Sequence, residues 1–144
     1  MTLDEIYETF MWRSDETQDE YEERIADAIN EAKKYKYLHP FIQPLIPGNS
    51  ISVWDPCARV IALKSDEELY PYLPVLFEWL QDINWPGATI IFDRLLQMPF
   101  SEIEKWYYYS HRQAEREVEQ EDRTIWLLTL DALKKEIDKK QNCE

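Results

Sequence analysis

Residues 76–88, LFEWLQDINWPGA, join two helix signals through a corner marked by a proline. Apolar residues recur at spacings of three and four on both sides of this corner, at Leu73, Leu76, Phe77 and Leu80 and again at Ala88, Ile91, Phe92 and Leu95. Such spacing places side chains on one face of a helix. Asn84 or Trp85 is placed to cap the second helix, with Pro86 in its first turn, where a missing backbone N–H does no harm. The stretch therefore predicts a helical hairpin.

The composition favours an all-α fold of one domain. The chain has 144 residues, a typical length for a single domain with its own core. It contains eight prolines and two glycines, whereas β-architectures use glycine in many turns. We therefore expect one all-α domain over residues 1–144. Residues 1–50 would supply N-terminal helices and a proline-rich connection, and residues 51–140 a core that resembles helical repeats.

Capping residues predict where other helices begin. Thr2 is placed to cap a first short helix, and Ser65 and Ser101 each precede a glutamate by three residues, which is the capping-box pattern. Further helices are expected over about residues 16–37 and 122–139, with acids first and lysines last, as the helix dipole prefers. Pro71 and Pro74 are expected to divide the segment after Ser65. Residues 38–51 should hold one short helix and a loop with turn residues at 47–49.

A weak internal repeat relates two helices that contain an early proline. Pro56, Ala58, Val60 and Ile61 match Pro86, Ala88, Ile90 and Ile91 at an offset of 30 residues. Stacked helical pairs of the HEAT or armadillo type repeat at about 40 residues. We therefore expect a compact HEAT/armadillo-like stack of antiparallel helix pairs, with about six to eight helices.

The charge of the chain restricts its partners. Sixteen basic and 29 acidic residues give a net charge of −13, which repels both a phosphate backbone and anionic lipid. Nucleic-acid binding is therefore not expected, and a basic protein partner is favoured. No apolar run approaches the roughly 20 residues of a membrane span, so we expect a cytoplasmic protein without membrane contact.

No group of residues predicts catalysis, a metal site or a cofactor. His39 and His111 fall in different segments, and Cys57 and Cys143 lack the C-x-x-C spacing of a metal or redox site, so we expect two reduced thiols. The common catalytic motifs and glycine-rich phosphate loops are absent. We therefore assign no catalytic residue, no metal ligand and no cofactor.

Three groups of residues are candidates for binding a partner. A dense negative surface is expected before and within the second helix, at Asp15, Glu16, Asp19, Glu20 and Glu23. The aromatic run 106–109 cannot all face the core, which exposes Tyr108, and Asp82 and Trp85 lie at the corner. Such acidic faces are often merely solvated, and tyrosines often lie at the edge of a core. The corner itself is expected to be chiefly structural, with Trp79 or Trp85 partly exposed.

Residues 78–86, E-W-L-Q-D-I-N-W-P, are called here the tryptophan box. They resemble the signature of an uncharacterised bacterial family of small helical proteins, in which E-W-L-Q-D-x-N-W-P lies between two repeat helices. The similarity is looser from Ser52 to about Pro99. It implies a bacterial source and an α-helical, repeat-like fold, with no assigned reaction or cofactor.

By class, the chain is similar to bacterial immunity proteins, which neutralise a cognate toxin. Many such toxins are basic nucleases, and a negative surface can cover an active site built for phosphate. We therefore expect a non-enzymatic acidic protein that binds a basic toxin. The alternatives are a helical-repeat scaffold or regulatory interaction protein and, third, a small carboxylate enzyme with at least two acids of shifted pKa in one pocket.

Overall fold

The computed structural model describes residues 1–46 and 50–142, and these form helices and turns without a strand. The α-helices are α1 (Leu3–Phe10), α2 (Gln18–Lys33), α3 (Trp54–Ala62), α4 (Asp66–Leu69), α5 (Leu73–Glu78), α6 (Ala88–Leu96), α7 (Phe100–Glu115) and α8 (Gln120–Asn142). The 3₁₀ helices are η1 (His39–Phe41), η2 (Gln43–Leu45), η3 (Ile51–Val53), η4 (Tyr70–Tyr72) and η5 (Trp79–Gln81). The predicted all-α class is confirmed. The expected turn at Pro47, Gly48 and Asn49, and Cys143, lie outside the described residues.

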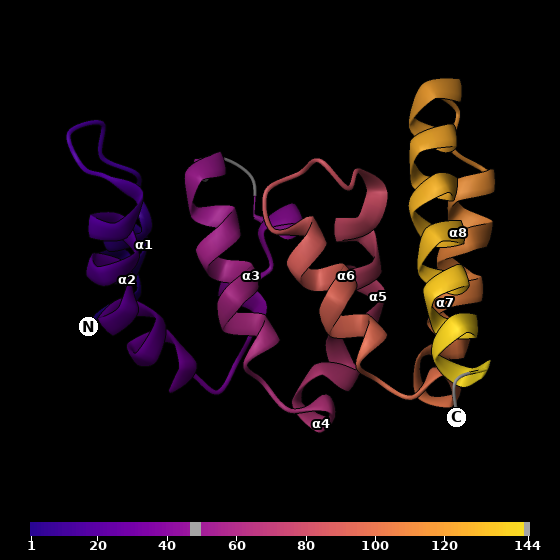
Figure 1. Ribbon diagram of the computed structural model, residues 1–144, viewed down its shortest axis with the longest axis horizontal. Coiled ribbons are helices and arrows are strands. Elements are labelled where there is room, and N and C mark those ends of the chain that lie inside the picture. Colours follow the sequence, from indigo (N-terminus) through magenta and orange to yellow (C-terminus); the bar gives the residue numbers. More distant parts are fainter. Residues whose placement is uncertain (47–49, 143–144) are drawn as a thin grey trace.

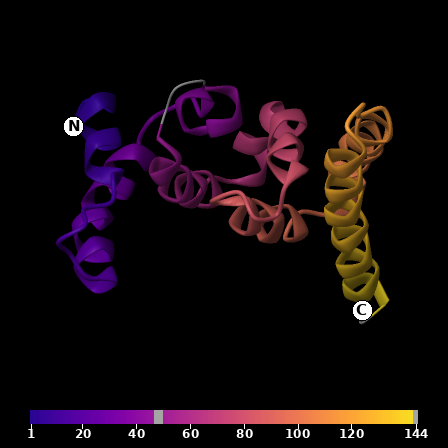
Figure 2. The same cartoon turned by 90° about the horizontal axis from the view of Figure 1, so that it is seen from above.

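The helices stack in two rows (Figures 1 and 2). One row contains α2, α3, α6 and α8, which all run downwards in Figure 1, and the other contains α1, η1 with η2, α5 and α7, which run upwards. Neighbours within a row pack on each other, α2 on α3, α3 on α6 and α5 on α7. The structure therefore confirms the expected stack of antiparallel helix pairs.

Each helix of the row α2, α3, α6 and α8 begins one repeat unit of the stack. The spacing of these units differs from the predicted offset of 30 residues. Helices α2, α3, α6 and α8 begin at residues 18, 54, 88 and 120, so successive units are 36, 34 and 32 residues apart. Pro56 is the third residue of α3, whereas Pro86 precedes α6 by two residues. The two prolines therefore occupy different structural positions, and the matched sequence positions are not equivalent in the stack.

Local capping signals identify two of the three expected helix starts. Thr2 and Ser65 form capping boxes with Glu5 and Glu68, as predicted. Ser101 does not cap: α7 begins at Phe100, two residues earlier than a Ser101 cap requires, because Pro99 stands at the cap position and its carbonyl accepts the Glu102 N–H. Its fixed φ and missing N–H suit a helix start without a side-chain cap.

The middle of the chain is divided more finely than the pattern predicts. Pro71 and Pro74 do separate the segment after Ser65, into α4, η4 and α5. Residues 38–46 form two 3₁₀ turns instead of one short helix, because Pro40 and Pro44 each begin a new turn. The second helix is shorter than predicted and ends at Lys33, and the last one is longer, from Gln120 to Asn142.

The corner at 79–87 packs against α3. Gly87 has a φ of 82° and precedes α6, so the predicted cap at Asn84 or Trp85 is wrong. The fully buried Trp79 donates its Nε1–H to the Pro86 carbonyl at 3.0 Å. Trp54 of α3 meets the rings of Trp79 and Trp85 edge-on, with centroids 5.8 and 5.6 Å away. The corner is therefore a structural element, as expected, and Trp85 is the tryptophan that remains half-buried.

Basic side chains connect the lower ends of successive units. The Lys64 amine, after α3, donates to the carbonyls of Lys33 and Tyr35 at the end of α2, at 2.6 and 2.9 Å. Arg94 of α6 donates to the Lys64 carbonyl at 2.9 Å, and Lys140 of α8 to the Leu96 carbonyl of α6 at 3.0 Å. The last carbonyls of a helix have no partner within it, so each cation satisfies the end of the preceding unit.

Cys57 is expected to be chemically inert in the folded protein. It lies fully buried in α3, and burial raises the pKa of its thiol above the usual range, against a smaller opposing effect of the Gln43 amide 3.3 Å away. In a Cys143→Ser variant, Cys57 should react with a thiol reagent at least about a hundredfold more slowly in buffer than in urea, because the thiolate is the nucleophile. Equal rates in the two solvents would contradict this packing.

Candidate functional site: an acidic edge with two pockets

The upper edge of the molecule in Figure 1 is acidic, because the four downward-running helices all begin there. Carboxylates are favoured at helix N-termini, where the dipole is positive. The acids of this edge lie before and in the first two turns of α2, in the corner, and around the start of α8: Asp15, Glu16, Asp19, Glu20, Glu22, Glu23, Asp82, Glu117, Glu119, Glu121 and Asp122. Lysines gather at the opposite, lower edge, where α2, α3 and α8 end: Lys33, Lys34, Lys36, Lys64, Lys139 and Lys140.

The predicted acidic surface at α2 divides into two kinds of carboxylate. Asp15, Asp19 and Glu23 are exposed and form no ion pair or hydrogen bond with a described residue. Glu16 instead pairs with Arg24 at 2.5 Å, and this hydrogen-bonded pair lowers the pKa of Glu16. Glu20 closes a capping box with Thr17. Three of the five predicted acids therefore remain available to a partner.

The other predicted binding residues do not all join this surface. Asp82 accepts the Asn84 backbone N–H at 2.8 Å, a contact within the turn and not with the next helix. Asp82 and Trp85 line a small pocket at the upper edge. Tyr108 is 44% exposed on α7, where its ring meets Phe100 edge-on. It lies in the other row of helices and lines neither of the two pockets of the upper edge.

Two adjoining pockets open at the upper edge. The larger, called here the α5–α7 pocket, has a volume of about 470 Å³, and its polar lining includes Glu78, Gln81, Tyr109, Gln113, Arg116, Glu117 and Trp126. The smaller, called the corner pocket, has a volume of about 130 Å³ and is lined by Asp82, Trp85, Asp122 and Ile125. Gln81, Glu117 and Trp126 line both pockets. Four carboxylates from α5, the corner and the α7–α8 region therefore line two neighbouring pockets.

Two groups in the α5–α7 pocket lack partners within the described chain. Glu78 forms no ion pair or hydrogen bond there, and desolvation raises the pKa of its carboxyl group. The Trp126 side chain is 6% exposed, and its buried Nε1–H has no acceptor among the described residues. A buried donor without an acceptor costs about 1–3 kcal/mol. Glu78 is therefore suited to interact with a bound molecule, whereas the Trp126 Nε1 has no accessible surface.

The sequence pattern does not single out Glu78, Glu117, Asp122 or Trp126. The spacing of four between Glu78 and Asp82 would place both on one helix face, but α5 ends at Glu78 and Asp82 has an extended backbone, so this spacing gives no valid signal. Glu117, Asp122 and Trp126 reach the two pockets only through the stacking of α7 and α8 beside α5.

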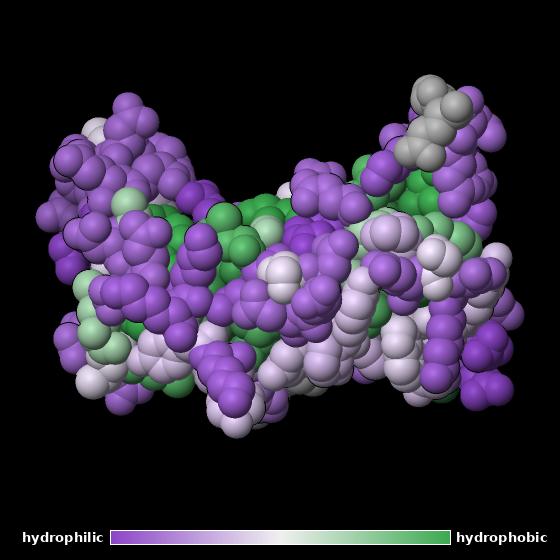
Figure 3. All heavy atoms as spheres, turned by 90° about the horizontal axis from the view of Figure 1, so that it is seen from below, coloured by the Kyte–Doolittle hydropathy of each residue, from purple (hydrophilic) through white to green (hydrophobic). Residues whose placement is uncertain are grey.

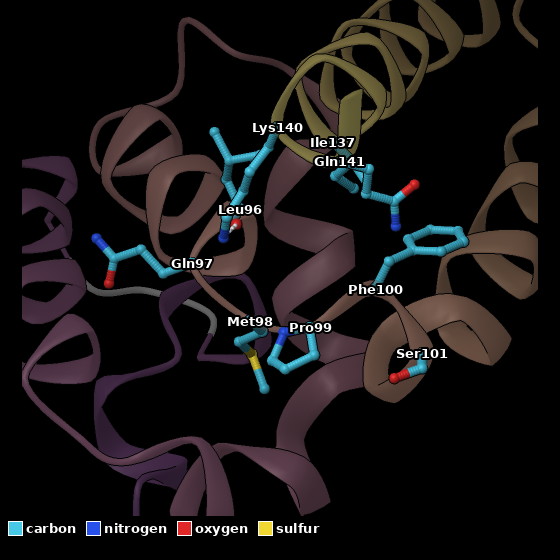
Figure 4. A pocket seen from close by; sticks show the side chains of 9 residues that line it. All are labelled: Leu96, Gln97, Met98, Pro99, Phe100, Ser101, Ile137, Lys140 and Gln141. Atoms are coloured by element: carbon cyan, nitrogen blue, oxygen red, sulfur yellow. Dashed lines mark hydrogen bonds between the residues drawn. The ribbon is translucent and has the colours of Figure 1, made fainter. Parts of the chain in front are cut away.

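A third hollow lies at the lower edge, between the α6–α7 connection and the end of α8. Figure 4 shows its lining, which is largely apolar and includes Leu96, Met98, Phe100 and Ile137, and its volume is about 420 Å³. Among the described residues of that lining, Lys140 is the only ionisable one. Its amine is already bonded to the Leu96 carbonyl. This hollow therefore offers shape and apolar surface, whereas the upper pockets offer unpaired carboxylates.

The row of α2, α3, α6 and α8 forms a concave face. Seen from below, α2 and α8 project on either side of a saddle whose floor is largely hydrophobic (Figure 3). One groove on this face, between α6 and α8, has a volume of about 460 Å³ and is lined by Ile83, Phe92, Leu128 and Ala132, with Asp93 as its carboxylate. Concave faces of helical stacks are frequent binding surfaces.

The described residues contain neither a metal-binding cluster nor a helix that could span a membrane. Within residues 1–46 and 50–142, no three His, Cys, Asp or Glu side chains are grouped to hold a metal ion. His111 of α7 contacts Glu115 at 2.6 Å and Asp131 of α8 at 3.4 Å, which connects the two helices. No helix in the described part of the chain has both the length and the apolar character needed to cross a membrane.

Part of the chain is similar to a known protein family. A family model described as a domain of unknown function, DUF5071, matches residues 56–107, from α3 to the middle of α7. The matched segment contains the tryptophan box, the corner and Glu78, but not α1, α2 or α8. No curated protein and no solved structure matches the chain. Over residues 56–107 the chain is therefore similar to a family of unknown function, in agreement with the resemblance of its tryptophan box.

Proposed function

We propose that this protein is a non-enzymatic binding module for a basic protein partner, and that the partner contacts the acidic upper edge. The observation that carries this proposal is the set of exposed, unpaired carboxylates Asp15, Asp19 and Glu23 on the same edge as the acid-lined pockets. In a chain of net charge −13, such an edge attracts a positive surface and raises the rate of encounter.

The most specific form of this proposal is an immunity protein that covers the active site of a cognate basic, nuclease-type toxin. The class-level similarity supports it, and so does the chemistry, since a cleft built to bind phosphate presents the positive charges that the upper edge complements. The test is co-expression with the product of the neighbouring gene: the chain should bind that product and restore growth. Absence of both binding and rescue would remove the proposal. The alternative function, a helical-repeat scaffold, predicts that no toxin-like gene lies next to the gene of this protein.

Neutralising two acids of the upper edge should weaken this binding. The double variant Asp19→Asn with Glu23→Gln is expected to lower the affinity for the basic partner about fivefold at low salt, mainly through slower association, because rim charges act on the rate of encounter. The effect should shrink as ionic strength rises. Surface plasmon resonance at several salt concentrations would measure both rates.

A matched control removes the same charge elsewhere. Glu67 and Glu104 are exposed and lie in α4 and in the first half of α7, towards the lower edge, so Glu67→Gln with Glu104→Gln changes the net charge equally. Only the first double variant should slow association. Equal slowing by the two would mean that net charge acts without a defined surface.

A further inference from the structure

Glu78 is a carboxylate placed where its charge is poorly solvated and uncompensated. It ends α5 and lines the α5–α7 pocket, and no described cation lies within ion-pair distance of it. Desolvation raises its pKa, and no described residue offsets the loss of water. A positive group that enters the pocket would supply this missing compensation.

The acceptors around Glu78 come from several directions. Gln81 of η5 and Gln113 of α7 carry amide oxygens, and Glu117 adds a second carboxylate. A guanidinium group has five N–H donors in a planar fork and is more weakly hydrated than an ammonium group. It therefore matches several acceptors in a half-buried pocket better than a lysine amine does. Tyr109 and Trp126 provide aromatic rings of the kind on which a guanidinium stacks.

Trp126 lines the pocket with its ring and takes no part in binding the cation through a hydrogen bond. Its Nε1 is buried, without accessible surface and without an acceptor among the described residues. The unpaired carboxylate of Glu78 therefore points to a guanidinium group, and the proposed function supplies that group as an arginine residue of a protein partner.

We propose that the α5–α7 pocket receives an arginine residue of the basic partner, with its guanidinium on the Glu78 carboxylate. This inference rests on the proposed function and names the group that anchors the partner. Arg116, an exposed cation on the same pocket, competes weakly for the carboxylates. The remaining acids of the upper edge then steer the partner, while Glu78 selects the residue.

The test uses N-acetyl-arginine amide, which carries the guanidinium and two carbonyl groups, with the full-length chain. Its binding is followed by the indole N–H resonances in two-dimensional NMR, where Trp126→Phe identifies the Trp126 signal. The arginine probe should shift this signal saturably, and the neutral isostere N-acetyl-citrulline amide should bind at least about tenfold more weakly, as expected for loss of a charged hydrogen bond. N-acetyl-lysine amide should fall between the two.

Variants separate the pocket from general attraction to an acidic protein. Glu78→Gln keeps the shape of the side chain and should weaken the arginine probe at least about tenfold, whereas Glu67→Gln, which removes the same charge at the lower edge, should leave its binding unchanged. Arg116→Gln should strengthen binding about threefold. Equal binding of the arginine and citrulline probes, no saturable shift of the Trp126 signal, or equal effects of Glu78→Gln and Glu67→Gln would overturn the inference.

The two proposals can fail separately. If the basic partner binds the wild-type chain and the Glu78→Gln variant equally, the arginine pocket is refuted and the binding function stands. If the arginine probe binds as expected but no basic partner does, the proposed function is refuted, and the pocket is left as a site for an arginine residue of some other polypeptide.

Discussion

Replacing Gly87 with alanine is expected to lower the free energy of unfolding by about 3–4 kcal/mol. Gly87 has a φ of 82°, a conformation that costs residues with a Cβ about 1–2 kcal/mol. A Cβ at this position would also lie 2.7 Å from the Ala58 Cβ and 3.0 Å from both the Trp54 carbonyl oxygen and the Trp79 ring. These atoms are backbone or fully packed core, so relief requires α6 to move away from α3, and overpacking of this kind costs about 1–3 kcal/mol. Urea denaturation monitored by circular dichroism would measure the loss.

Two further variants test the cause of that loss. Thr89→Ala lies two residues away on the exposed side of α6 and should change the stability by less than about 0.5 kcal/mol. Gly87→Asn separates the two costs, because asparagine tolerates positive φ but still carries a Cβ. If the close approach dominates, asparagine should be nearly as harmful as alanine. A loss below about 1 kcal/mol for alanine would show that the corner does not hold α6 against α3.

The sequence predicts those parts of the fold that depend on neighbouring residues. Thr2 and Ser65 cap helices because the glutamate that completes each box lies three residues away. Thr17 with Glu20 follows the same pattern, so this helix start was also accessible from sequence. The corner differs. Its helix begins after Gly87 instead of Asn84 because Trp54 and Ala58, about 30 residues earlier, leave room only for a residue without a side chain.

The candidate site also has a part that neighbouring residues determine and a part that depends on contacts between distant residues. The exposure of Asp19 and Glu23 follows from the amphipathic pattern of α2, and Asp15 lies in the turn before that helix. The partner of Glu16 does not, because Arg24 reaches it across the turn between α1 and α2 while also donating to the Thr9 and Met11 carbonyls. The upper pockets depend on three separate segments that meet only when the units stack. No local pattern of spacing reports such a meeting, so these pockets are found in the structure alone.

Replacing Lys64 with methionine is expected to cost about 3 kcal/mol, because it removes a link between two repeat units. Lys64 is 7% exposed, and its buried amine donates to the Lys33 and Tyr35 carbonyls at the end of α2. Methionine has a similar length but no donor, so both carbonyls would lose their partner while partly shielded from water. Hydrogen bonds to charged groups contribute about 1.5–3 kcal/mol each, part of which offsets the cost of burying the amine.

The position of Lys64 also predicts how the protein should unfold after this substitution. A helical stack is stabilised by the interfaces between neighbouring units, so weakening one interface lets a terminal unit open before the rest. In Lys64→Met, α1 and α2 should open at lower urea than the other helices. Trp12 lies between these two helices and packs on Tyr21, so the change should be seen in the Trp12 indole N–H resonance before the loss of helical circular dichroism. The control, Lys135→Met on the exposed side of α8, should leave a single transition and change stability by less than about 0.5 kcal/mol. If Lys64→Met behaves like this control, water replaces the amine at both carbonyls, and the stack is held together by apolar packing alone.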